Sequence, residues 1–449
     1  MTQNIYRFLQ KISKLDYKEI SMAFRNWPVA AAVGLGVLLT TAPSGAYAQK
    51  LTKFEIEQGR EMLRKVKSEF TKNYYDPTFH GMDPDERFKL ADEKMKSAES
   101  SGQVLGIIAQ LLLDLNDSHT LFVPPMRTSR VEYGWQMKPV GADCYVSAVK
   151  PGSDAEAKGL RVGDKVVSIE GRPMDRTKVW LAKYLYYVLR PQSGLTVVVH
   201  TTEGQQKQLF IQAKLRDRDF KLDDEEEDRL NRQRFYELSD DVLIWKMPHF
   251  QRSEFEVDDQ IGKFRNRKAL ILDLRGNPGG KVDTLERFAG YFFGRDVKIA
   301  DLRGRKEMKP MMAKGHNEKA FKGQLIVLVD GESSSASELF ARVVQLEKRG
   351  TVIGDRSAGR VMESRSYPLR LGLVDVIYFG ISVTDADLIM IDGKSLEHVG
   401  VTPDELLLPT TQDMATKRDP VLARAAWLVG INLDPAKAGV LFPIEWRSR

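Results

Sequence analysis

The sequence predicts an α/β protein whose core of strand–loop–helix units follows a helical domain and a small strand-rich domain. Two apolar segments, 269–274 and 324–330, each precede a turn rich in glycine or serine and then a helix with one apolar face. A third apolar strand is expected at 351–354. This repeated order favours βαβ units and a mainly parallel sheet. The composition, with 42% apolar and 29% charged residues among 449, is that of a globular protein.

Residues 1–48 have the layout of a secretory signal peptide. Basic residues precede an apolar run at 27–42, and the Ala-Tyr-Ala sequence at 46–48 supplies small residues where signal peptidases cleave. The run has 16 residues, whereas a helix that spans a bilayer needs about 20. We therefore expect an exported protein, periplasmic or extracellular, that begins near Gln49. Membrane attachment is expected only if the segment stays uncleaved.

Residues 49–128 are expected to form a helical domain. Thr52 and Glu55 have the spacing of a capping box. The helix that follows has apolar residues at four-residue intervals, and a second helix is predicted over 84–99. A third helix carries one apolar stripe between Val104 and Leu115.

Residues 129–217 change to short β-branched segments separated by turns. Strands are predicted at 145–149, 165–169 and 196–200, with a short helix at 155–160. The acidic stretch 223–228 is interpreted as a solvated linker with a plain charged face. The α/β core is then expected over 218–410, followed by a C-terminal segment at 411–449.

Two loops of the predicted core lie where ligands bind in α/β proteins, beyond the carboxyl ends of the strands. One contains Gly279 and Gly280, whose missing side chains let the backbone approach a substrate. The other places Ser335 at a helix start, where backbone N–H groups favour developing negative charge. Ser335 is thus a candidate nucleophile, although Ser335-x-x-Glu338 is also the pattern of a capping box. His119, preceded by Asp117 and Ser118, is the candidate proton acceptor.

Several classes of function are excluded by what the sequence lacks. The single cysteine, Cys144, excludes an internal disulfide and a multi-cysteine metal site. No metalloprotease, phosphate-loop or dinucleotide-binding motif is present, so neither metal nor cofactor is expected. The net charge of +6 lies partly in the first 48 residues and gives no reason to expect nucleic acid as a partner.

Five motifs in order resemble a known family. LILDLRGNPGG (270–280), GESSSASE (331–338) and GDRSAGR (354–360) resemble the core of the carboxyl-terminal processing peptidases, or tail-specific proteases, whose superfamily includes the tricorn protease core. GLRVGDKVVSIEG (159–171) resembles the signature of PDZ domains, and LEHVGVTPD (396–404) resembles the closing motif of the family. The resemblance implies a crotonase-like, ClpP-like core over 218–410 and a PDZ-like domain over 129–217.

The resemblance also implies roles for particular residues. Ser335 matches the nucleophile, and the Ala336 amide with that of Gly279 or Gly280 matches the oxyanion hole. The family's basic lysine falls at Arg360, whose guanidinium stays protonated and cannot take up the serine proton.

The tricorn-like branch supplies another base. There His119 matches the general base, with Ser118 and Glu397 orienting it, while His398 replaces the glycine that usually follows this glutamate. Glu338 and Arg360 remain candidates for capping the helix and lining the cleft.

The PDZ-like domain is expected to bind peptide ends, with Tyr133, Gly134 and Trp135 in the candidate binding loop. The resemblance therefore implies an exported serine endopeptidase that cleaves peptides or unfolded proteins by acyl transfer, assisted by the PDZ-like domain. The alternative, favoured by Arg360, is a catalytically inactive peptide-binding protein with the same fold. A lipid-carrying relative is a third, weaker hypothesis.

Overall fold

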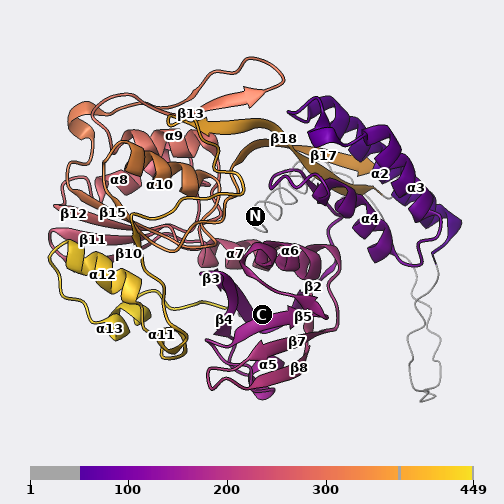
Figure 1. Cartoon of the computed structure of the whole chain (residues 1–449), viewed down its shortest axis with the longest axis horizontal. Helices are drawn as coiled ribbons and strands as arrows, with labels where there is room; N and C mark the ends of the chain where they lie inside the picture. The colour runs from indigo at the N-terminus through magenta and orange to yellow at the C-terminus, as the bar shows by residue number, and fades with distance from the viewer. Residues whose placement is uncertain (1–50, 373–375, 447–449) are drawn as a thin grey trace, which may run out of the picture.

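The computed structural model of the chain describes residues 51–372 and 376–446, so the predicted signal peptide lies outside the described residues. Figure 1 shows the N-terminal helices on one side, the α/β core on the other, the strand-rich domain beneath, and the C-terminal helices against the core. None of the described helices combines the length and the apolar character that crossing a membrane requires.

The described part of the N-terminal unit contains three α-helices: α2 (Lys53–Asn73), α3 (Pro84–Met95) and α4 (Ser101–Leu113). The predicted capping box is present, because the Glu55 amide donates to the Thr52 hydroxyl at 3.2 Å and the Glu55 carboxylate accepts from the Thr52 amide at 2.8 Å. The predicted apolar stripes are buried, but they do not pack only on one another. Phe379 and Ile381 of strand β18 complete the cluster.

Strand β18 (Ile377–Met390) belongs to a sheet that extends from the core to the helical unit (Figure 1). The other strands of this sheet are β1 (Leu121–Val123), β13 (Val297–Gly304), β14 (Met311–Ala313) and β17 (Met362–Leu371). β1 lies antiparallel to β18, with Phe122 opposite Ile381. This pairing anchors the chain immediately after His119 to a strand of the core.

The strand-rich domain is a sheet in the order β3-β4-β5-β7-β8 with a short β6 beside β5. Its strands are β3 (Trp135–Val140), β4 (Asp143–Val149), β5 (Lys165–Ile169), β6 (Arg172–Pro173), β7 (Gly194–His200) and β8 (Gln206–Gln212). The helices are α5 (Asp154–Ala157) and α6 (Val179–Lys183), which continues as a π-helical turn at Tyr184–Leu189. β3 ends the sheet, and α6 packs beside it through Met137, Val179 and Tyr186.

The core sheet has the order β10-β11-β12-β15-β16-β19, and all its pairs are parallel except β10 with β11. The strands are β10 (Arg234–Ser239), β11 (Val242–Lys246), β12 (Ala269–Asp273), β15 (Gln324–Val329), β16 (Thr351–Gly354) and β19 (Glu405–Leu406). Alternate residues enter two clusters: Leu270 faces helices α8 (Glu254–Gly262), α9 (Val282–Gly290) and α10 (Ala336–Leu346), while Ile271 faces the C-terminal helices. Burial on both faces explains the continuous apolar runs.

The interpretation of residues 223–228 as a solvated linker is wrong. They lie in helix α7 (Phe220–Leu230), and the side chains of Asp223 and Glu227 are buried. Asp223 forms an ion pair with Arg130. Arg130 lies in β2 (Ser129–Glu132), which pairs with β9 (Lys214–Asp217) in a small two-stranded sheet. Charge composition alone predicts solvent exposure, but a basic partner from another segment allows acidic residues to be buried.

The C-terminal segment adds helices α11 (Thr411–Ala415), α12 (Pro420–Leu428) and α13 (Pro435–Val440). An arginine of the RGNPGG turn ties it to the core sheet. Arg275 donates to both carboxylate oxygens of Asp273, at 2.9 and 2.8 Å, and to both of Asp419, at 2.9 and 2.8 Å. Asp419 also caps α12 by accepting from the Leu422 amide at 2.9 Å. The turn and the C-terminal segment are therefore held by one guanidinium.

We expect Asp419→Ala to lower the free energy of unfolding by about 3 kcal/mol, because it removes a helix cap and one partner of a largely buried charge. Urea unfolding measures the change. Lys268→Ala, which breaks an exposed ion pair with Asp241, is the control and should cost less than about 1 kcal/mol. Equal losses in the two variants would contradict the role given to Asp419.

Candidate active site

Ser335 lies between β15 and α10 with a strained backbone. Its φ of 57° and ψ of −120° fall in the left-handed half of the map, where a residue with a side chain is disfavoured. Its amide donates to the Arg360 carbonyl at 2.9 Å and to Glu338 Oε2 at 3.0 Å. The loop after β16 therefore holds the backbone of the predicted nucleophile.

The two predicted loops are joined directly. The Ser334 amide and the Ser337 hydroxyl both donate to the Asn277 carbonyl, each at 3.0 Å. The Ser333 hydroxyl donates to the Leu274 carbonyl at 2.9 Å. The serine-rich turn thus rests on the RGNPGG turn through side chains and backbone.

Glu338 is fully buried and its carboxylate accepts four hydrogen bonds. The donors are the Ser357 hydroxyl at 2.6 Å and the amides of Gly359, Arg360 and Ser335 at 2.7, 3.0 and 3.0 Å. Burial raises the pKa of Glu338 to about 7, against the opposing effect of these donors. The glutamate predicted as half of a capping box therefore also fixes the loop 357–360 against the start of α10.

Gly279 lies against the predicted nucleophile, with a φ of 88°. A Cβ atom at Gly279 would approach the Ser335 Cβ to 2.7 Å and the Ala336 nitrogen to 2.8 Å, so a side chain does not fit there. Its amide donates to Asn277 Oδ1 at 2.9 Å. Within the described residues, the amides of Gly280 and Ala336 donate no hydrogen bond. Of the predicted oxyanion donors, these two remain available.

A chain of hydrogen bonds links Glu397, Ser118 and His119. The Ser118 hydroxyl donates to Glu397 Oε2 at 2.8 Å and lies 2.7 Å from His119 Nδ1. Because the hydroxyl proton is directed at Glu397, Nδ1 must carry the proton in the second bond, which leaves Nε2 as an acceptor. Glu397 also accepts from the Ser118 amide at 2.9 Å and from the Val361 amide at 2.7 Å.

Asp117 holds the backbone of the loop that carries His119, a role that the sequence did not predict in detail. Its Oδ1 accepts from the amides of His119 and Thr120, at 2.8 and 2.9 Å, and from the Thr384 hydroxyl at 2.7 Å. Thr384 lies on β18, 267 positions away, and no local signal in the sequence pointed to it.

Arg360 connects the two halves of the site. Its backbone bonds to Ser335 and Glu338, while its Nη2 donates to the Ser118 carbonyl at 2.7 Å. The guanidinium lies 3.8 Å from the centre of the Trp180 ring. Burial, together with the charge of Arg360, lowers the pKa of His119 to about 3. No hydrogen bond joins the His119 ring to Ser335 in the described structure, so Arg360 is the link between them.

His398, which replaces the family's glycine, has a φ of 61°. This left-handed conformation explains the usual preference for glycine at the position. The His398 ring lies 2.7 Å from the Asn116 carbonyl through Nε2, and the residue remains exposed. The substitution is therefore accommodated without moving Glu397 away from Ser118.

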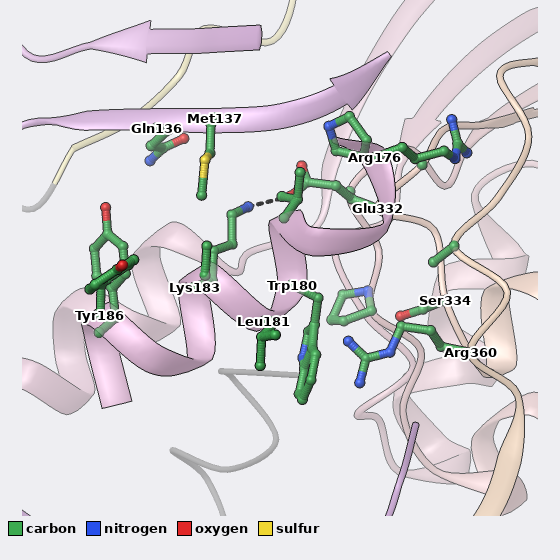
Figure 2. Close-up of a pocket in the computed structure, with 18 of the residues that line it drawn as sticks. Gln136, Met137, Arg176, Trp180, Leu181, Lys183, Tyr186, Glu332, Ser334 and Arg360 are labelled. Atoms are coloured by element: carbon green, nitrogen blue, oxygen red, sulfur yellow. Dashed lines mark hydrogen bonds and ion pairs between the residues drawn. The ribbon is translucent and has the colours of Figure 1, made fainter. Parts of the chain in front are cut away.

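A cavity of about 1120 Å³ separates the strand-rich domain from the core. Its lining includes Ser334 and Arg360 from the core and Tyr133, Gly134 and Trp135 from the strand-rich domain. Figure 2 shows Met137 and Lys183 between Tyr186 on one side and Ser334 and Arg360 on the other. The predicted peptide-binding residues are not a free loop, since Tyr133 and Trp135 are buried and Trp135 begins β3.

Comparison with known proteins agrees with these features. Residues 241–407 match the model of peptidase family S41, and residues 145–186 match a PDZ domain. The chain is 24% identical over 340 residues to the tail-specific protease of Haemophilus influenzae, covering 71% of this chain and 47% of that protein. It is 32% identical over 142 residues to a carboxy-terminal-processing protease of Bartonella bacilliformis, covering 30% of each.

A solved structure shares the fold. The crystal structure of mature CPAF is 14% identical, covers 81% of this chain and 95% of its own, and superposes with a TM-score of 0.61. The chain spans less than half the length of the two relatives named above. Together, the comparisons identify residues 241–407 as a peptidase core of family S41 and residues 145–186 as a PDZ domain, and they support the resemblance to the carboxyl-terminal processing peptidases. The predicted fold class, an α/β peptidase core with N-terminal helices and a PDZ domain, is confirmed.

We expect Glu338→Gln to destabilise the site although it preserves the shape of the side chain. Both carboxylate oxygens accept two hydrogen bonds, so either orientation of the amide sets its NH₂ against two donors. The free energy of unfolding should fall by about 1–3 kcal/mol, as for buried donors left without acceptors. Urea unfolding measures it, with Glu55→Gln in the exposed capping box of α2 as the control. A loss no larger than that of the control would refute the role of Glu338.

Proposed function

We propose that this chain is a serine endopeptidase that cleaves peptides or unfolded proteins by acyl transfer. The observation that carries the proposal is the hydrogen-bond chain from Glu397 through Ser118 to His119. Its glutamate accepts from the amide of Val361, next to Arg360, whose carbonyl holds the Ser335 amide. Ser335 and His119 directly follow Ser334 and Ser118, two residues that line the cavity, and the Gly280 and Ala336 amides are available as donors. Acyl transfer requires such a nucleophile, an oriented base and amide donors.

In this mechanism the Ser335 hydroxyl oxygen attacks the carbonyl carbon of the scissile peptide bond, and His119 Nε2 takes up the hydroxyl proton. The oxyanion that forms accepts hydrogen bonds from the Gly280 and Ala336 amides, and the start of α10 adds a favourable partial charge. Collapse of this intermediate breaks the C–N bond, and the leaving amine receives the proton from His119. A water molecule then attacks the acyl-enzyme with His119 again as the base, which releases the acid and regenerates Ser335.

His119 rather than Arg360 is the proton acceptor in this proposal. Burial lowers the pKa of Arg360 to about 9, so its guanidinium remains mostly protonated at neutral pH. The His119 ring, in contrast, is neutral at this pH because its pKa is lowered, so it can accept a proton.

The proposal includes capture of substrates in the cavity beside β3 and export directed by residues 1–48, which gives a periplasmic or extracellular enzyme. A free edge strand beside a helix is the arrangement by which PDZ domains add a peptide as a further strand. The alternative of a catalytically inactive peptide-binding protein receives no support from the comparisons.

Labelling with a fluorophosphonate probe tests the proposal most directly. The probe phosphonylates an activated serine, so the intact protein should label at Ser335 and the Ser335→Ala variant should not. Ser334→Ala is the matched control, since it removes a neighbouring hydroxyl and leaves the nucleophile. Absence of labelling in the intact protein would refute the proposed function.

The two candidate bases differ in their expected effects on turnover. His119→Ala should lower turnover of a peptide substrate about 100-fold or more, which is the scale of one positioned acid–base group. Arg360→Ala should cost much less, since Arg360 positions Ser118 and lines the cavity. A nearly active His119→Ala variant beside an inactive Arg360→Ala variant would reverse the assignment.

The pH dependence should show the lowered pKa of His119. A base works when it is deprotonated, so a pKa of about 3 keeps His119 competent as the pH falls. We expect kcat/KM to fall only well below the ordinary histidine value of about 6.5. Arg360→Gln removes a charge that opposes protonation and should move the acidic limb toward higher pH. An acidic limb near 6.5 in the intact enzyme, unchanged by Arg360→Gln, would contradict this electrostatic account.

A further inference from the structure

An ion pair lies halfway along the cavity. It joins the PDZ domain to the loop 331–335 that leads to Ser335, which we call the catalytic loop. Lys183, at the end of α6, pairs with Glu332, which precedes Ser335 by three residues. Figure 2 shows this pair between Tyr186 and Gln136 on one side and Ser334 and Arg360 on the other. A peptide that lies along β3 and reaches Ser335 must therefore pass the Lys183 ammonium.

The catalytic loop approaches β3 closely at this point. A Cβ atom at Gly331 would lie 2.6 Å from the Pro139 ring, so the loop that bears Glu332 touches the end of the strand that would bind a peptide. Met137 of β3 and Leu181 of α6 lie on either side of Lys183 in Figure 2. The ammonium thus projects from a helix across the space in which the added strand would run.

Three other charged groups of the cavity wall are engaged elsewhere, whereas the exposed Arg356 has no ion-pair partner among the described residues. Each of these three groups pairs with residues outside the cavity wall. Glu132 pairs with Lys150 and Arg216, Glu445 pairs with Arg229 and Arg232, and Arg176 pairs with Asp355. The Lys183–Glu332 pair differs, because both side chains are 30% exposed and each has only the other as its ion-pair partner among the described residues. Partly exposed pairs contribute little net free energy, so another carboxylate can replace Glu332 at small cost.

We propose that Lys183 selects substrates with an acidic side chain, and that Glu332 is the intramolecular carboxylate such a side chain displaces. This inference rests on the proposed function, since it names a substrate class for the same site. The position of Lys183 halfway along the cavity favours a side chain over a chain terminus. A peptide that continues to Ser335 is still a continuous strand where it passes Lys183, so only its side chains are presented there.

Binding to the Ser335→Ala protein tests this selection separately from catalysis. The probes are fluorescent unstructured peptides in which one residue is Glu or Gln, scanned along the sequence, each with a free or an amidated C-terminus. At the preferred position the Glu peptide should bind about threefold more tightly than the Gln peptide. Glu332→Gln should increase that ratio to about tenfold by freeing Lys183, and Lys183→Gln should abolish it.

Lys178→Gln is the matched control, because Lys178 forms an exposed pair with Asp175 near α6 and lies outside the cavity lining. It should leave the Glu-to-Gln ratio unchanged, and thermal unfolding of all variants checks that they fold. A ratio that survives Lys183→Gln, or that falls in Glu332→Gln, would overturn the proposal. So would a preference that follows the free C-terminus, or one abolished by Arg356→Gln instead. Because labelling of Ser335 is measured independently, failure of this selectivity leaves the proposed peptidase activity to be judged on its own test.

Discussion

The carboxylate of Glu338 receives hydrogen bonds from three amides and one hydroxyl, and the arrangement of the whole site depends on it. Two of those donors belong to Ser335 and Arg360. A serine in a disfavoured backbone conformation keeps that conformation only when the surrounding structure fixes its backbone. A buried acid with four donors provides this, because removing any one contact leaves a polar group without a partner in a dry interior. The geometry of the serine is therefore set by a buried residue that does not line the cavity.

The candidate catalytic groups come from distant parts of the chain. His119 follows the helical unit, Ser335 begins a core helix, and Glu397 follows β18. The pairing of β1 with β18 brings the first and last of these together, and Arg360 connects the loop of His119 to Ser335. The helical unit, which shares its apolar cluster with β18, thus serves to position the base as well as to fold.

The sequence predicted those features that local pattern determines. The strands at 269–273 and 351–354 are mostly apolar because both faces are covered, and this signal is contained in a few residues. The start of α10 and the Thr52 cap were predictable for the same reason. The roles of Asp117 with Thr384 and of Trp180 with Arg360 were not, because each depends on partners about 180 or more positions apart. Helix α7 was misinterpreted because acidic residues show their charge in the sequence but not the arginine that neutralises them.

The pairing of β1 with β18 also orders events during synthesis. A ribosome releases the chain from its N-terminus, so the segments that carry His119 and Ser335 emerge before β18 and Glu397 exist. Until then β1 has no partner strand, and the histidine has neither its anchor nor its acidic neighbour. Domains fold as units once their chain is complete. In the proposed mechanism a nascent or truncated chain would carry the nucleophile without an oriented base, so hydrolytic competence arises only after β18 and Glu397 have been synthesised.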